Sequence, residues 1–478
     1  MIIIAVVLLY FLALFGIGRW TSRKATNDTF YRANRRAPWY MVAFGMVGAS
    51  ISGVTFVSVP GMVLTSGMTY LQLCLGFILG YLLVAFVLLP LYYRLNLTSI
   101  YAYLGQRLGR HSYKTGAWFF LLSKLAGSAV KFYVVCIILQ QFVLDAMGIP
   151  FWATVVAMVA LIWLYTHRGG IGTLVFTDSF QTLCLFTALL LIIYKVIGQM
   201  DFSLGDAVRA IAADERSRIF VFDDWVSRQN FWKQLLSGAF IVVVMTGLDQ
   251  DMMQKNLTCR TLREAQKDMC SYGVAFLPAN LLFLALGILL AQLFEGQGVP
   301  LPKGDELLPM YVQSAANSQF SIFNSQLVEV LFTIGIVAAS FSSADSALTS
   351  LTTCFCIDIC EHPADEWLRK RTHIAMCLLF VVFILLFRVL NSTSLIDAIY
   401  ILVSYTYGPL LGLFAFGLLT KRNVHDKFVP FVCVLSPVLC YLLDSVAQTL
   451  WGYRFGYELL LLNGMLTFLG LWCCAERR

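Results

Sequence analysis

A carboxylate and a row of hydroxyl groups interrupt one of the most apolar parts of this chain, between Ala339 and Thr353. On a helix, Ala339, Ser342, Ser343 and Ser346 share one face, and Asp345 lies at its edge. An Asp in hydrocarbon costs a few kcal/mol or more unless it meets a cation, a partner or water. Oxygen ligands with one carboxylate suit a small monovalent cation, so this stretch indicates an ion or substrate path.

The alternative reading of the hydroxyls is purely structural. Ser and Thr in membrane helices bond back to the carbonyl one turn earlier, or join neighbouring helices. That reading explains the hydroxyls as well as an ion site does, but it leaves Asp345 unexplained.

Other charges also lie within apolar segments. Asp178 is a functional candidate as an intramembrane carboxylate, although it could instead be an interfacial Asp that reaches cytoplasmic water. Asp249 and Asp251 border a basic stretch and could simply pair with Lys255. The sequence leaves these alternatives open.

One long apolar segment carries a polar stripe. Lys124, Ser128 and Lys131 are spaced at i, i+4 and i+7, so they share a helix face. Both ammonium groups should face water or an anion, although Lys124 could also extend to the inner interface. A cavity position for Lys131 would favour an anionic or carboxylated solute.

The elements that position these groups are membrane helices. The 478 residues are 59% hydrophobic and 13% charged, with mean hydropathy +0.76, against about 25% charged residues in soluble proteins. Each apolar run of about 17–25 residues can cross a bilayer as a helix. The predicted spans are residues 2–18, 40–64, 70–93, 117–146, 150–166, 172–198, 231–253, 269–295, 323–358, 373–390, 394–420, 428–450 and 457–474.

Basic residues predict the orientation of these thirteen spans. The side that includes the C-terminus has roughly three times as many Lys and Arg residues as the opposite side. Short loops rich in Lys and Arg stay in the cytoplasm. We expect a multi-pass protein of the cell membrane, with the N-terminus outside and the C-terminus cytoplasmic. The net charge of +7 then reflects topology, not nucleic-acid binding.

Two spans are interrupted by helix-weakening residues. Residues 48–53 break the second span, and Met245 to Gly247 break the seventh. Paired breaks at corresponding positions are typical of inverted-repeat transporters, although small residues also allow close helix packing. This pattern predicts a first five-helix repeat at 40–198 and a second, with an outside loop, at 199–420. Residues 1–39 and 421–478 are then peripheral additions to a single transmembrane domain.

Enzyme chemistry finds little support in the sequence. The five histidines are widely separated, with no metal-binding spacing among them. The chain contains no nucleophile elbow and no phosphate-cradling Gly-rich loop. We therefore expect no catalytic residue and no organic cofactor.

Taken in order, four motifs resemble the sodium:solute symporter family. They are Ala49 to Gly53; Gly169-Gly170 with Thr177 to Gln181; Gly247 to Gln250 leading to Gln254 to Leu257; and Ala339 to Ser346 with Asp358. The resemblance implies an all-α polytopic membrane protein with a LeuT-like core of two inverted five-helix repeats. It also implies symport driven by Na+, the coupling ion.

The resemblance implies site residues as well. Carried across by motif, the principal sodium site comprises Gly48, Ile51, Ala339, Ser342 and Ser343. A possible second sodium would involve Asp178, Ser342, Asp345 and Ser346. We expect the solute contacts to be Ser50, Ser52, Thr55, Thr246 and Lys131.

The sequence thus predicts a sodium-coupled symporter that imports a small polar organic solute by alternating access. The solute could be a sugar, an amino acid or a sialic-acid-like carboxylate, and the other partner is membrane lipid. Two alternatives remain: a transporter-like sensor or channel without coupled uptake, and an integral membrane enzyme using Asp178 and Asp345 as an acid/base pair.

Overall fold

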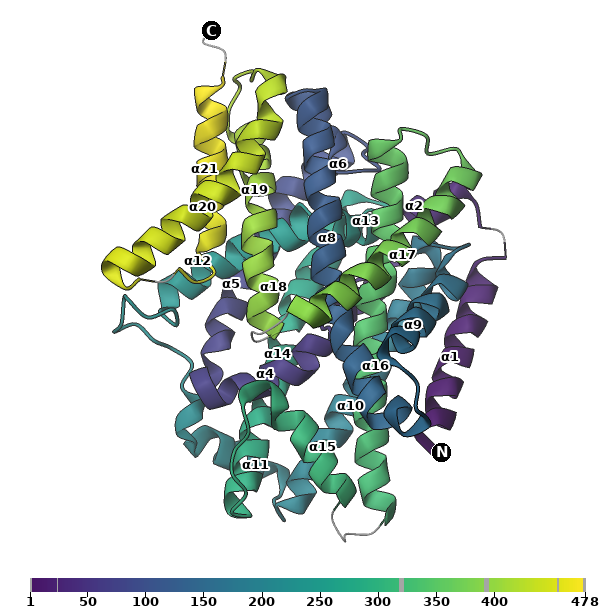
Figure 1. The fold of residues 1–478 in the computed structure, drawn as a ribbon, viewed down its shortest axis with the longest axis vertical. Helices are drawn as coiled ribbons and strands as arrows, with labels where there is room; N and C mark the ends of the chain where they lie inside the picture. The colour runs from purple at the N-terminus through teal and green to yellow at the C-terminus, as the bar shows by residue number, and fades with distance from the viewer. Residues whose placement is uncertain (1, 24, 318–321, 391–394, 454, 476–478) are drawn as a thin grey trace.

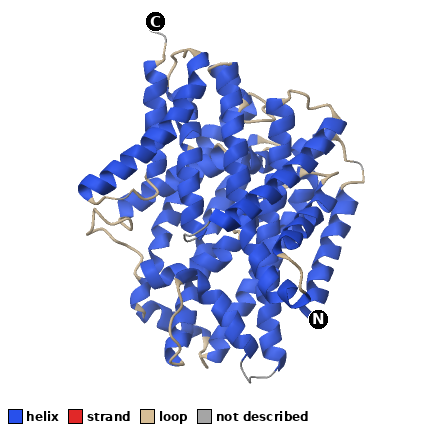
Figure 2. Cartoon of the chain, in the orientation of Figure 1, coloured by secondary structure: helices blue, strands red, loops and turns tan. Residues whose placement is uncertain are grey.

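The computed structural model describes the chain except residues 1, 24, 318–321, 391–394, 454 and 476–478. Throughout the described residues the regular structure is helical, and no strand forms (Figure 2). The long helices pack into one bundle, with the C-terminus at the end opposite α11 and α15 (Figure 1). The all-α prediction is therefore confirmed.

Helical segments lie within every predicted span. The longer helices are α1 (Ile2–Thr21), α3 (Trp39–Ser50), α4 (Gly53–Ser66), α5 (Tyr70–Leu83), α8 (Arg110–Leu139), α9 (Phe151–Thr166), α10 (Ile171–Gln199), α11 (Leu204–Ala213), α12 (Phe231–Val242), α14 (Leu262–Gly296), α15 (Leu307–Asn317), α16 (Ile322–Cys354), α17 (Glu366–Leu390), α18 (Leu395–Thr406), α19 (Gly408–Leu419), α20 (Val429–Trp451) and α21 (Leu459–Cys473). The shorter ones are α2 (Asn27–Arg32), α6 (Leu89–Arg94), α7 (Ala102–Arg107) and α13 (Gln250–Asn256).

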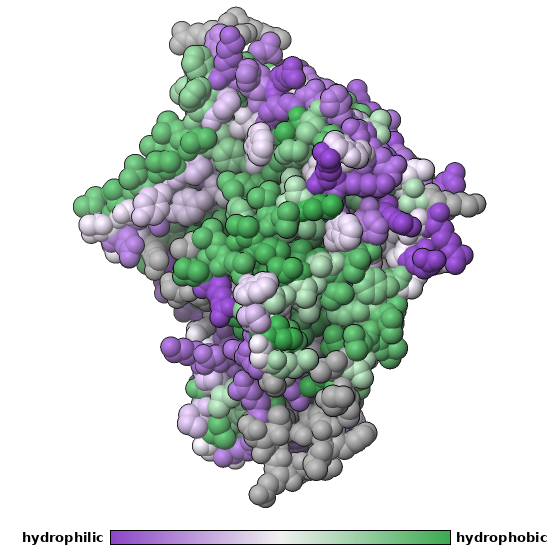
Figure 3. Space-filling model, turned by 45° about the vertical axis from the view of Figure 1, so that its right-hand side comes forward, coloured by the Kyte–Doolittle hydropathy of each residue, from purple (hydrophilic) through white to green (hydrophobic). Residues whose placement is uncertain are grey.

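The outer surface of the bundle is apolar across its middle and hydrophilic toward the end that holds the C-terminus (Figure 3). Large apolar side chains such as Phe86, Val389 and Phe431 are exposed to the outside of the protein. An apolar surface of this extent marks contact with lipid.

Helix length and hydropathy identify the candidate membrane spans in the structure. In the described part of the chain, seven helices are long and apolar enough to cross a bilayer, or eight if one bent pair counts as a single span. Several other apolar helices, among them α1, α3 and α9, are shorter. The count of thirteen stays a prediction, and the first residue of the predicted span 394–420 lies outside the described residues.

The first predicted break is present between α3 and α4. Helix α3 ends at Ser50, and both Ile51 and Ser52 are extended before α4 begins at Gly53. Because the helix stops, its last carbonyls have no N–H group one turn further along to bond. Polar backbone is therefore left for other partners inside the bundle.

The second predicted break is also present. A π-helical turn at Val243–Gly247 ends α12, and α13 leaves at an angle of 71°. Asp249 caps α13, because its carboxylate accepts hydrogen bonds from the backbone N–H groups of Asp251 and Met252. The break thus places a carboxylate at a helix N-terminus, where the helix dipole favours negative charge.

Glycines bring the broken helices close to their neighbours. A Cβ atom at Gly48 would lie 1.9 Å from the Thr182 hydroxyl oxygen on α10, and one at Gly76 would lie 2.2 Å from the Leu235 carbonyl oxygen on α12. Only a residue without a side chain allows α3 to contact α10, and α5 to contact α12, at these distances.

A short amphipathic segment at Leu204–Ala213 forms α11. After it, Arg216 bonds Asp214 and Glu295, which ties the loop to the end of α14. The Arg216 side chain lowers the pKa of Asp214 to about 2. The loop is therefore fixed against the bundle by charge.

Candidate ion and substrate site

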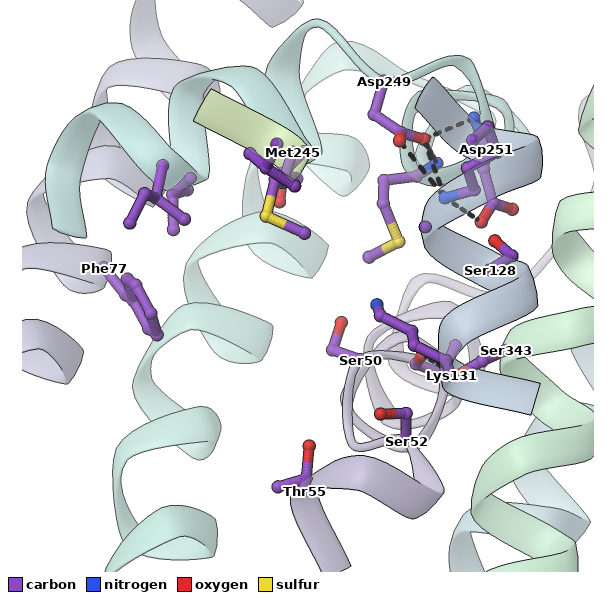
Figure 4. Close-up of a pocket in the computed structure, with 18 of the residues that line it drawn as sticks. Ser50, Ser52, Thr55, Phe77, Ser128, Lys131, Met245, Asp249, Asp251 and Ser343 are labelled. Atoms are coloured by element: carbon purple, nitrogen blue, oxygen red, sulfur yellow. Dashed lines mark hydrogen bonds and ion pairs between the residues drawn. The ribbon is translucent and has the colours of Figure 1, made fainter. Parts of the chain in front are cut away.

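A cavity of about 130 Å³ lies inside the bundle, lined by residues of both helix breaks (Figure 4). Helices α4, α5, α8, α12, α14 and α16 contribute to its wall. The five predicted solute contacts, which are Ser50, Ser52, Thr55, Lys131 and Thr246, all line it. The fold thus brings together residues that are almost 200 positions apart in the sequence.

Four residues of the predicted principal sodium site lie where α16 meets the end of α3. The Ser343 hydroxyl donates a hydrogen bond to the Ala49 carbonyl at 2.7 Å. Gly48 and Ile51 lie on either side of Ala49 in the backbone at the end of α3. Ala339 is buried on α16, one turn before Ser343. The Ala49 carbonyl at the end of α3 therefore faces the Ser343 hydroxyl on α16, and oxygen atoms of these two kinds are ligands that a sodium ion uses.

The remaining member of that predicted site, Ser342, faces a different neighbour. Its hydroxyl donates to Asp178 at 2.9 Å, and the Lys255 ammonium contacts the other oxygen of Asp178 at 2.7 Å. The side chains of Lys255 and Asp178 are 3% and 1% exposed. The interpretation of Asp178 as an interfacial carboxylate in cytoplasmic water is therefore wrong.

Asp345 lies next to this ion pair, close enough to interact electrostatically with both Asp178 and Lys255. The Tyr165 hydroxyl donates to Asp345 at 2.7 Å, and the Ser346 hydroxyl donates to it at 3.3 Å. With both carboxylates ionised, the two Asp and one Lys sum to one negative charge. One monovalent cation would balance the cluster.

A second buried ion cluster forms part of the cavity wall. The Lys124 ammonium contacts Asp249 at 3.2 Å and Asp251 at 2.7 Å. The Tyr407 hydroxyl donates to Asp249 at 2.6 Å. The direct partner of both carboxylates is therefore Lys124, which does not extend to the interface, and Lys255 interacts with Asp251 only at longer range.

Lys131 differs from the other two lysines of the core. It lines the cavity, and no hydrogen bond or ion pair joins its ammonium to any described residue. Figure 4 shows Lys131 directed from α8 into the cavity near Ser50, away from the Lys124 cluster. Lys131 therefore makes no direct ion pair with a described residue, although Asp249 and Asp251 lie close enough to interact with it electrostatically.

Sequence reasoning missed several partners. Lys255 belongs to a basic stretch of the sequence, but its side chain is buried in the bundle. The one sequence signal for this position is that Lys255 lies in the motif from Gln254 to Leu257. Nothing in the sequence singles out Tyr165, Tyr272 or Tyr407. Each is an ordinary aromatic residue of an apolar segment until the packing shows its hydrogen bond.

Two broken helices that face a polar cavity inside an apolar bundle define a membrane transporter of the LeuT-like, inverted-repeat class. The profile of the sodium:solute symporter family matches residues 30–426. The chain therefore belongs to the sodium:solute symporter family and is a sodium-coupled transporter, not an enzyme.

Known relatives agree with this assignment. The chain is 25% identical over 446 residues to the sodium/sialic acid symporter NanT of Aliivibrio fischeri, covering 90% of this chain and 85% of the relative. It is 27% identical over 258 residues to the human sodium/iodide cotransporter, covering 52% of this chain and 39% of the relative.

A solved structure shares the whole fold. It is a Na+-coupled sialic acid symporter in a substrate-bound outward-open state, with TM-score 0.81 and 20% identity, and the match covers 100% of this chain and 99% of the other. At this identity the likeness shows the fold alone. The inverted-repeat expectation is thus confirmed, but not the solute.

Proposed function

We propose that this symporter imports a small organic anion and binds its carboxylate between Lys131 and the N-terminus of α4. The observation that carries the proposal is the ammonium of Lys131, which has no counter-ion among the described residues and is directed into the cavity. A partly buried ammonium without a direct partner favours an anionic ligand. Sialic acid and iodide, the solutes named for the two relatives, are both anions.

Helix α4 supplies a second reason. Ser52 is its N-cap residue but makes no side-chain capping bond, so the first N–H groups of this 14-residue helix receive no hydrogen bond from that side chain. A helix N-terminus attracts anions through these N–H groups and its dipole. Ser50, Ser52, Thr55 and Thr246 would then contact the rest of the solute.

We propose that sodium binds at Gly48, Ile51, Ala339, Ser342 and Ser343, and that a second ion binds at Asp178, Ser342, Asp345 and Ser346. The bond from Ser343 to the Ala49 carbonyl supports the first site, because it marks the contact between α16 and the break. The excess negative charge beside Lys255 supports the second. Sodium and solute would raise each other's affinity by equal factors.

Transport would follow from motion of residues 40–198 against residues 199–420 about the cavity. The first segments, 1–39, and the last, 421–478, would stay peripheral. Because basic residues favour the cytoplasm, we assign the C-terminus to the inside and the N-terminus to the outside.

Ser343→Ala is expected to raise the sodium concentration for half-maximal uptake about ten-fold, since one hydroxyl ligand is worth roughly 1.5 kcal/mol. The measurement is solute uptake against sodium concentration. Ser350→Ala is the control, because Ser350 lies on the same helix but bonds back to Ala347. Equal sodium dependence in both variants would remove Ser343 from the site.

The transport itself is tested by reconstituting the protein in proteoliposomes and measuring uptake of labelled anions with and without an inward sodium gradient. Concentrative uptake that needs the gradient is the expected result. Sodium binding without concentrative uptake would instead support a sensor, and uptake that merely equilibrates the solute would support a channel.

A further inference from the structure

The Tyr272 hydroxyl on α14 meets side chains from three other segments at the cavity. Its oxygen lies 2.5 Å from the hydroxyl oxygen of Ser50, the last residue of α3. It accepts a hydrogen bond from the Tyr81 hydroxyl on α5 at 2.8 Å. The side chain of Thr246, at the second break, lies close enough to interact with the same hydroxyl. One phenol therefore links both helix breaks to α5 and α14.

The bonding capacity of this phenol matches its neighbours. A Tyr hydroxyl has one O–H group to donate and two lone pairs to accept. The bond from Tyr81 uses one lone pair, which leaves the O–H group and the other lone pair for Ser50 and Thr246. Although Tyr272 lines the cavity, it is 1% exposed. Its hydroxyl is thus engaged by the protein, so it positions other residues instead of binding a solute.

Packing of α14 against α5 fixes the Tyr272 ring. The rings of Tyr81 and Tyr272 meet edge to face with their centres 4.5 Å apart, a favourable aromatic geometry. The neighbouring Gly273 makes room for this contact, because a Cβ atom there would lie 2.6 Å from a ring carbon of Tyr81. The position of the hydroxyl is therefore set by α5 and α14, and it can hold Ser50 in turn.

Ser50 lies within the backbone that is proposed to bind sodium. It is between Gly48 and Ile51, and the carbonyl just before it, that of Ala49, accepts a hydrogen bond from Ser343. Because α3 ends at Ser50, the carbonyls of its last turn have no N–H partner further along their own helix. The bond between Ser50 and Tyr272 therefore restrains a stretch of backbone that its own helix does not hold.

The second break is held by protein hydroxyls alone. Tyr92 donates to the Gly247 carbonyl at 2.8 Å, and Tyr101 donates to the Leu248 carbonyl at 2.8 Å. These two tyrosines take the place at the second break that an ion is proposed to take at the first. Thr246 therefore belongs to a break whose geometry needs no ion, and Tyr272 joins it to a break whose geometry depends on one.

Resting on the proposed sodium site, we infer that Tyr272 is a positioning residue for sodium binding. Its hydroxyl holds Ser50, and with it the backbone from Gly48 to Ile51, in the arrangement that sodium requires. It also ties this arrangement to the second break across the cavity. Tyr272 is not itself a ligand of the ion.

The test measures sodium binding with the ion itself as the probe. Unfolding temperatures of the purified protein are recorded as sodium chloride replaces choline chloride at constant total salt, which gives the half-saturating sodium concentration. Tyr272→Phe is expected to raise this concentration about five-fold, the effect of losing one hydrogen bond. A lower unfolding temperature in choline with an unchanged half-saturating concentration would show a merely structural role and overturn the inference.

Tyr311→Phe is the matched control. It also removes a buried Tyr hydroxyl, but that hydroxyl donates to Gln199, and Tyr311 does not line the cavity. Its half-saturating sodium concentration should equal that of the unaltered protein. An equal rise in both variants would mean that loss of any buried hydroxyl weakens sodium binding, and would overturn the inference.

A double-mutant cycle tests the route through Ser50. Ser50→Ala removes the same hydrogen bond from the smaller side chain, so it should raise the half-saturating sodium concentration about as much as Tyr272→Phe. The double variant should show no further rise, because the bond is already lost. Additive effects would show that Tyr272 does not act through Ser50. Ser50→Ala also serves as the test if Tyr272→Phe folds poorly.

Ser343→Ala separates this inference from the proposed sodium site. A rise in the half-saturating sodium concentration for Ser343→Ala but not for Tyr272→Phe or Ser50→Ala would overturn the inference and keep the site. No rise for Ser343→Ala would overturn the site and, with it, the inference. A rise for all three variants is the expected result.

Discussion

Lys131→Met is expected to raise the half-saturating concentration of a transported carboxylate about 10- to 100-fold, and at the same time to stabilise the solute-free protein. The affinity falls because a hydrogen bond to a charged group is worth about 1.5–3 kcal/mol. Stability rises because the variant removes a partly buried ammonium that makes no direct ion pair with a described residue. Uptake kinetics and the unfolding temperature without solute are the two measurements.

Lys124→Met is the matched comparison. This variant also removes an ammonium group from the same helix and the same cavity. Unlike Lys131→Met, it leaves Asp249 and Asp251 without the cation that they contact. The expected change in unfolding temperature is therefore opposite in sign. Lys131→Arg keeps the charge and should retain most of the affinity. A Lys131→Met protein that is destabilised like Lys124→Met would show that Lys131 has a structural partner and would refute the anion site.

Lys255→Met and Asp178→Asn are each expected to reduce the yield of folded protein severely. Each leaves one member of a buried ion pair alone, and breaking such a pair costs about 3–5 kcal/mol, a large part of the stability of a typical domain. The double variant removes both members of the direct pair, so it should recover part of the folded yield, while Asp345 still loses the nearby Lys255 charge. The measurements are the monodisperse yield and the unfolding temperature of the two single variants and the double variant.

An exposed pair of similar geometry provides the control. Lys370 contacts Glu366 at 2.8 Å, but both side chains are more than half exposed. Such surface pairs contribute about 0–1 kcal/mol, so Lys370→Met should leave the unfolding temperature nearly unchanged. Strictly additive losses in the Asp178 and Lys255 double variant would mean that the two residues do not act as a pair.

The break positions could be predicted from sequence because they depend on local chemistry. Glycines and hydroxyl-bearing residues at 48–53 weaken a helix wherever it lies, and the chain does leave the helix at Ile51 and Ser52. The same holds for α11, whose bounds follow from its own amphipathic period. Ser342 and Ser343 could be singled out for the same reason, as polar groups in an apolar run.

The partners of the charged residues could not be predicted in this way. Lys124 meets Asp249 and Asp251, and Lys255 meets Asp178, across helices that are far apart in sequence. Proximity in the sequence suggests Lys255 as the cation that pairs with Asp249 and Asp251. However, α13 turns away at the second break and carries Lys255 toward Asp178 on α10.

The sequence by itself therefore determined the membrane class, the two breaks and the residue types that could bind a cation or an anion, because each follows from hydropathy and from intrinsic helix preference. Only the tertiary structure decided which lysine of the core makes no direct ion pair with a described residue. Several core lysines and aspartates allow many pairings, and the choice among them depends on how close the packed helices bring each pair. That choice leaves Lys131 in the cavity without a direct ion pair to a described residue, which is the basis of the proposed anion site.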